Sequence, residues 1–302
     1  MNGISLPPAR IVGPMWSDDF AVLLGLKESA RPNYHKPNNE VERLYRLVAY
    51  KNHNAELDEG QQDIVWARFC ALYLPATVKL FLNPPTSSGD TPEMIQELKL
   101  NSAYFEVLVG IQHIPYFAKY LRSSKPTAAG GKKLTQALAE RVVSLAPTWD
   151  RHLLSPEVDS RTGRPGDYFK SVIGSAVQLL STLLTTFVKE DLATVLSAAT
   201  KAELLPWLQK WSARYMREFL GEVCLRTLGI LSGERGFNKG VRSMRKVFKN
   251  WDTCGIPTCE VTENLKVCGR CQTVRYCTPG HQRAHWTDPS APHKEMCHKT
   301  DY

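Results

Sequence analysis

Hydrophobic positions recur with a helical period through most of the first 250 residues of the chain. In the segment 41–48, valine and leucine return every three or four residues, and apolar residues in 64–73 mark a second helix. No stretch alternates apolar and polar residues for long enough to predict a sheet. The pattern therefore predicts a mostly α-helical chain.

Proline, glycine and small polar residues divide the helical pattern. We expect Pro75 to end or kink the helix that contains 64–73, and Pro115 to end or bend a later one. A further helix should stop near Pro147. The stretches 123–133 and 155–167 are rich in turn-forming residues, so both are expected to be loops.

The order of these helices leaves two architectures open. Helices of roughly 10–20 residues joined by short loops suit a solenoid-like stack of hairpins, for example an armadillo-like one, or an irregular bundle. No repeat with a fixed motif is evident. The longest run without a charge, 171–188, is diluted by small polar residues and predicts a buried helix, so no membrane contact is expected.

The residues with metal-binding chemistry gather near the end of the sequence. Six of the 8 cysteines and four of the 8 histidines follow residue 250. Cys70 and Cys224 lie alone in apolar helical stretches and are expected to be small buried side chains. The others form pairs with two to four residues between the members: Cys254 and Cys259, Cys268 and Cys271, Cys277 and His281, and His293 and Cys297.

This spacing is typical of a zinc-binding segment. Thiolate and imidazole are ligands that zinc prefers, and two ligands a few residues apart can hold one ion. Eight positions suffice for two closed tetrahedral sites, with no open position for a catalytic water. A segment with so few aliphatic residues needs metal binding to supply its folding free energy.

The same segment resembles a MYND-type zinc finger. The resemblance rests on the Cys-x2-Cys pair at 268–271, a Tyr-Cys pair at 276–277, His281 followed by Gln282, Trp286, and a closing His-x3-Cys at 293–297. It covers about 45 of the 302 residues. The family's cross-braced fold implies two zinc ions with alternating ligand pairs: Cys254, Cys259, Cys277 and His281 for the first, and Cys268, Cys271, His293 and Cys297 for the second.

Three features depart from the family pattern. The first cysteine pair has four residues between its members, His281 stands where cysteine is commoner, and the loop from Trp286 to His293 is longer. Imidazole is a legitimate zinc ligand, so His281 is expected to bind. His285 and His298 are rival candidates for ligand positions.

The resemblance also implies a function, because MYND fingers serve as protein-interaction modules, often for proline-rich peptides. An extended proline-rich segment has a pre-organised backbone and docks on exposed aromatic side chains. By resemblance, Gln282 and Trp286 would line that groove. The alternative for Trp286 is packing inside the finger, which is also the role expected of Tyr276.

Charge supplies a rival interpretation. The chain has a formal net charge of +8, and the segment 235–250 holds six lysines and arginines and no acid. Such a segment can contact phosphates, which makes a nucleic-acid-associated regulator the alternative function. The simpler interpretation is the solvated face of a last helix.

Enzyme function is not expected. The sequence has no glycine-rich cofactor loop, nucleophile elbow or P-loop. A methyltransferase-related protein, with the finger inserted in a SET domain, would require strand-rich flanking segments.

The sequence thus predicts an α-helical domain over 1–250 and a MYND finger over 251–302 with its core at 254–297. The predicted function is a zinc-binding adaptor or scaffold that contacts a protein partner. The first residues lack a basic and apolar leader, and the cysteines are expected to be reduced, so we expect the cytoplasm or the nucleus.

Overall fold

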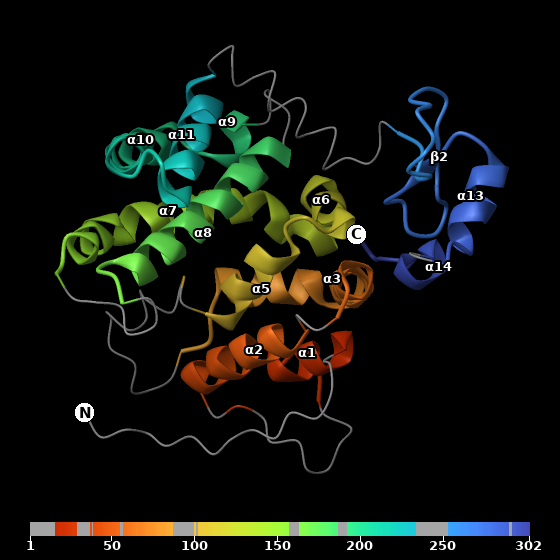
Figure 1. Ribbon diagram of the computed structural model, residues 1–302, viewed down its shortest axis with the longest axis horizontal. Helices are drawn as coiled ribbons and strands as arrows, with labels where there is room; N and C mark the ends of the chain where they lie inside the picture. The colour runs from red at the N-terminus through yellow and green to blue at the C-terminus, as the bar shows by residue number, and fades with distance from the viewer. Residues whose placement is uncertain are drawn as a thin grey trace.

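The computed structural model describes residues 16–28, 37, 39–54, 57–86, 100, 102–156, 163–186, 192–233, 253–289 and 292–302. Helices dominate the chain as far as Ser232, and a small sheet with two short helices follows (Figure 1). The elements are α1 (Ser17–Leu23), α2 (Glu40–Asn54), α3 (Glu59–Leu82), α5 (Ala103–Ile111), α6 (Pro115–Arg122), η1 (Pro126–Ala128), α7 (Ala129–Leu153), α8 (Asp167–Thr186), α9 (Leu192–Val195), α10 (Ala198–Arg214), α11 (Phe219–Ser232), β1 (Lys266–Val267), β2 (Arg275–Tyr276), α13 (Pro279–Trp286) and α14 (His293–Met296). The prediction of a mostly helical fold is confirmed.

The helices follow one another in layers. Figure 1 shows α1 and α2 at one end, then α3 with α5, then α7 with α8, and α10 with α11 at the other end, and each of these pairs is in contact. The helix lengths range from 4 residues in α9 to 25 in α7. A solenoid of equivalent repeats therefore stays a prediction.

Several helix ends follow directly from the local sequence. The side chain of Asp58 accepts a hydrogen bond from the Gln61 backbone N–H at 2.8 Å and begins α3. Ser102 and Ser197 cap α5 and α10 in the same way. Pro115 is the first residue of α6, where its missing N–H costs no hydrogen bond.

Two prolines lie inside helices that they were expected to interrupt. Pro75 does not end α3, and the prediction that a helix stops near Pro147 is wrong, because α7 continues to Leu153. An interior proline costs about 3 kcal/mol. Burial of neighbours such as Leu74 and Trp149 offsets that cost. Pro147 itself lies on the exposed face of α7.

The predicted loop at 123–133 is wrong in its second half. η1 occupies Pro126–Ala128, and α7 begins at Ala129. Gly130 and Gly131, in the first turn of α7, allow a close approach to α6, since a Cβ at Gly131 would lie 3.3 Å from the Leu121 Cα. Glycine at this point is thus a packing requirement rather than a sign of a loop.

The central helix α3 carries much of the core. Cys70 on α3 and Cys224 on α11 are fully buried, as predicted for small apolar side chains. By length and composition alone, α3 is the one described helix that could cross a membrane. However, 56% of its most apolar stretch is buried inside the protein, where α3 contacts α1, α5, α6 and α7, as a core helix does.

The last residues of the chain run from α14 back onto the helical part (Figure 1). We call residues 298–302 the terminal segment. The Tyr302 hydroxyl donates to the Cys70 carbonyl of α3 at 2.8 Å, and its ring meets the Tyr120 ring of α6 edge-on at 5.2 Å. The Thr127 hydroxyl donates to the Asp301 carbonyl at 2.7 Å. The predicted boundary near residue 250 and the basic segment 235–250 lie outside the described residues.

Candidate metal centre

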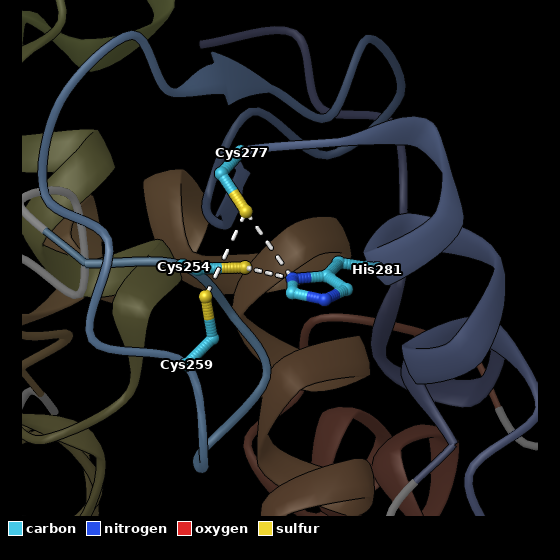
Figure 2. Close-up of side chains that lie close together, drawn as sticks. All are labelled: Cys254, Cys259, Cys277 and His281. Carbon is cyan, nitrogen blue, oxygen red and sulfur yellow. Dashed lines mark hydrogen bonds between the residues drawn. The ribbon is translucent and has the colours of Figure 1, made fainter.

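The first cluster contains one histidine nitrogen and three cysteine sulfurs that point toward a common centre (Figure 2). The Nδ1 atom of His281 lies 3.4 Å from the Cys254 Sγ and 3.2 Å from the Cys277 Sγ. The sulfurs of Cys259 and Cys277 are 3.7 Å apart. Ligands around a tetrahedral zinc are separated by roughly 3.3–3.8 Å, so these four atoms fit a zinc ion.

Local structure brings these four residues together. Cys254 and Cys259 belong to the loop before β1, whereas Cys277 directly follows β2. The Thr278 hydroxyl accepts a hydrogen bond from the His281 N–H at 3.1 Å and starts α13. The first turn of this helix thus carries His281 back over Cys277.

The second cluster is entirely buried. The sulfurs of Cys268 and Cys297 are 3.7 Å apart, and the Cys271 Sγ lies 3.5 Å from the His293 Nε2. All four ligand atoms lie within 4.8 Å of one another. The donor set is again three sulfurs and one nitrogen, which fits a closed zinc site.

The antiparallel pair β1–β2 connects the two clusters. Lys266 pairs with Tyr276, so Cys268 follows one strand and Cys277 follows the other. The ligand pairs therefore alternate along the chain, the first and third in one cluster and the second and fourth in the other. This interleaving is the cross-braced arrangement that the resemblance implies.

Hydrogen bonds favour a thiolate in each cluster. The Cys297 thiol, with His293 and Thr273, lowers the pKa of Cys271 to about 3 against the opposing effect of burial. Burial raises the pKa of Cys254, but hydrogen bonds from backbone N–H groups and from His281 outweigh it and lower the value to about 7. The pKa values of Cys277 and Cys297 are raised in turn, that of Cys297 chiefly by its hydrogen bond with Cys271. Because zinc binds the thiolate, metal binding must displace the protons of these two thiols.

The two rival histidines lie outside both clusters. The His285 Nδ1 is 2.9 Å from the Tyr276 hydroxyl, and its ring stacks on His293 at 5.2 Å. Burial lowers the pKa of His285, which keeps its ring neutral at pH 7. The His298 backbone bonds to Tyr116 of α6, and its ring lies 6.4 Å from the Tyr116 ring.

The predicted peptide-binding residues share α13, one turn apart. Trp286 is half-buried, and its ring meets His293 edge-on at 5.9 Å. Gln282 is also half-buried, and its Nε2 points to the Cys268 Sγ at 3.9 Å. Tyr276 is 2% exposed, which is the packing role that the sequence indicated.

Sequence reasoning missed a lysine beside the second cluster. Lys119 of α6 is 9% exposed, and its ammonium donates to the Cys271 carbonyl at 3.0 Å and to the Thr300 hydroxyl at 2.7 Å. Three thiolates and a divalent zinc leave one negative charge on this site, and Lys119 supplies a positive charge next to it. Lys119 is far from the finger in the sequence, so no local pattern indicated that it lies beside the second cluster.

Two closed Cys3His sites interleaved on a hairpin and a helix define a cross-braced zinc finger, a class of fold in which the metal is structural. Comparison with protein families gives its kind: residues 252–297 match the MYND finger. The protein therefore carries a MYND finger with two zinc sites near its C-terminus, and such fingers are protein-interaction modules. No curated protein and no solved structure matches the chain.

Proposed function

We propose that the protein is a non-enzymatic adaptor whose MYND finger binds a proline-rich segment of a partner protein. The observation that carries the proposal is the pair of four-residue ligand clusters within residues 252–297. Each zinc has four protein ligands and no position for a reacting water, so the metal supports an interaction surface rather than catalysis.

The helix α13 supports a particular surface for this contact. Gln282 and Trp286 lie one helical turn apart, and both side chains keep part of their surface accessible. Proline rings of an extended segment pack on an indole face, and a glutamine amide can hydrogen-bond the carbonyls of a polyproline-type backbone. The His293 ring contacts the Trp286 ring edge-on, which restricts the orientation of the indole.

The test uses the full chain loaded with zinc and a panel of synthetic peptides in which every second or third residue is proline. Binding is measured by fluorescence anisotropy. We expect Trp286→Ala to weaken binding about tenfold or more, since buried aromatic contacts dominate such interfaces. Trp16→Ala removes an exposed tryptophan from the helical part and serves as the matched control.

The zinc content of each variant is measured in parallel. Equal affinity of the wild type and Trp286→Ala at full zinc content would contradict the assignment of this surface. Absence of binding by every peptide in the panel would contradict the choice of a proline-rich partner.

A further inference from the structure

A cleft of about 820 Å³ lies between the finger and the helical part. One wall comes from α3, including Ala67, and from the start of α6, including Pro115. The other wall comes from the finger, including Ile256 and Val274, which are half-buried. Neither Gln282 nor Trp286 lines this cleft, so it is a different surface from the one proposed above.

The charged side chains in the described lining of the cleft are acidic, although the chain as a whole has a net positive charge. Among the residues that the structure describes, the lining includes Asp63 and Glu260 and no lysine or arginine. Glu260 is exposed, and the Asp63 side chain is 48% exposed, so both carboxylates face solvent. Asp63 contacts His113 at 3.2 Å.

The first zinc site adds to this negative charge. Its ligands Cys254 and Cys259 line the cleft. A zinc ion held by three thiolates and one imidazole keeps one negative charge. Partly enclosed by apolar walls, such charges act on a bound cation more strongly than they would in open water.

The combination of walls and charges defines the ligand. Apolar walls favour aliphatic or aromatic side chains, whereas carboxylates favour an ammonium or a guanidinium group. A polypeptide segment carries both kinds of group, and phosphate-bearing ligands would be repelled. We propose that this cleft binds a basic segment of a partner protein, with apolar side chains between its walls and lysine or arginine beside Asp63 and Glu260.

This site is additional to the proline-rich contact on α13. The two surfaces use different residues, so a partner can occupy either one alone. The cleft would also give the contact between the finger and the helical part a function, because the cleft exists only while the two stay together.

The test is a selection from a randomised peptide library displayed on phage, with the zinc-loaded full chain as target. We expect enriched peptides that combine apolar residues with lysine or arginine. Raising the salt from about 50 to about 300 mM should weaken their binding, since the contact with exposed carboxylates is screened.

Charge reversal then locates the site. Glu260→Lys should weaken the selected peptides about tenfold, and Asp63→Lys should have a similar effect. Glu263→Lys reverses an exposed charge in the same loop outside the cleft lining and should change little. Methyl signals of Ile256 and Val274 should shift in NMR spectra when a selected peptide is added.

The outcomes separate the two proposals. Selected peptides that carry no basic residue, or that bind Glu260→Lys and Asp63→Lys as well as the wild type, overturn the cleft proposal. A selection that yields no binder also overturns it. Peptides rich in proline that depend on Trp286 and not on Glu260 support only the contact on α13.

Discussion

At the scale of single residues, the two zinc-binding histidines use different ring nitrogens. His281 turns its Nδ1 toward the first cluster, whereas His293 turns its Nε2 toward the second. The Nδ1 atom is closer to the backbone than Nε2, and a cysteine sulfur is closer still. A cysteine can therefore replace His281 with little movement, but it cannot reach the position of the His293 Nε2 without a shift of α14.

This difference predicts the zinc content of four variants. His281→Ala should weaken zinc binding at the first site by roughly 100-fold or more, because only three ligands remain. His281→Cys should keep two zinc ions per chain, whereas His293→Cys should lose one. His285→Ala, which changes a histidine outside both clusters, should keep both. Elemental analysis after treatment with graded chelator measures the result.

The relative zinc retention of these variants identifies the histidine ligand of the first site. If His281→Ala retains zinc as well as the wild type while His285→Ala loses it, the ligand at the first site is His285. Equal retention in His281→Cys and His293→Cys would contradict the distinction between the two ring nitrogens.

The sequence indicated the metal centre because its signal is local. Ligand pairs two to four residues apart reveal a zinc site without knowledge of the rest of the fold. The contacts between the helical part and the C-terminal residues gave no such local signal. Lys119 lies 152 residues from Cys271, and Cys70 lies 232 residues from Tyr302. No local pattern connects residues at such separations, so these contacts could not be predicted.

At the scale of helices, local rules identified most elements but ended α7 too early, near Pro147 rather than at Leu153. The cost of an interior proline is local, whereas the burial that offsets it depends on neighbouring helices. α3, α7 and α10 each contain an interior proline. Helices that pack against several others therefore extend further than their sequences alone indicate.

The contact of α7 with α10 includes a charged cluster around Asp150. Its carboxylate, on α7, accepts hydrogen bonds from Lys210 at 2.7 Å, Trp211 at 3.1 Å and Arg214 at 3.0 Å. Burial raises the pKa of Asp150, but these hydrogen bonds and the nearby positive charges outweigh it and lower the pKa below 3.8.

A lowered pKa determines how this carboxylate contributes to stability as the pH changes. The stabilisation is complete above the unfolded-state pKa and is lost as the pH falls through the lower folded-state pKa. Asp150→Asn should therefore reduce the free energy of unfolding by about 1–3 kcal/mol, by the same amount at about pH 5 and about pH 8. Urea denaturation at several pH values measures the difference in the free energy of unfolding between the wild type and Asp150→Asn. A difference that shrinks between about pH 8 and about pH 5 would indicate a raised pKa and contradict the prediction.

At the scale of the whole molecule, the finger and the helical part are joined through the second zinc site. Cys297 is a ligand of that site, and the terminal segment begins at the next residue. Tyr302 is 3% exposed between α3 and α6. Zinc therefore holds the start of a segment whose end is buried in the helical core.

Removal of zinc should accordingly destabilise the helical part as well as the finger. Loss of the buried Tyr302 alone corresponds to about 2 kcal/mol, or a fall in Tm of roughly 4–8 °C. Far-UV circular dichroism should still report most of the helix content at room temperature. Hydrogen exchange after chelation should rise most in α3 and α6 and least in α10, which serves as the internal reference.

Unchanged exchange in α6 after complete loss of zinc would contradict this coupling and indicate two independent units.

The variant Lys119→Met provides a second measure of the coupling between the finger and the helical part. It removes the ammonium that bonds to Cys271 and Thr300, and we expect faster zinc release from the second site only.

The burial of Tyr302 also has a consequence for inherited or engineered truncations. A stop codon ahead of the finger would remove the cover from the Cys70 carbonyl and from the rings of Tyr116 and Tyr120, which are each 1% exposed in the intact protein. The shortened chain would present this aromatic surface to solvent and to the quality-control machinery of the cell. The expected phenotype is low abundance of the whole polypeptide, rather than a stable helical protein that lacks one binding activity.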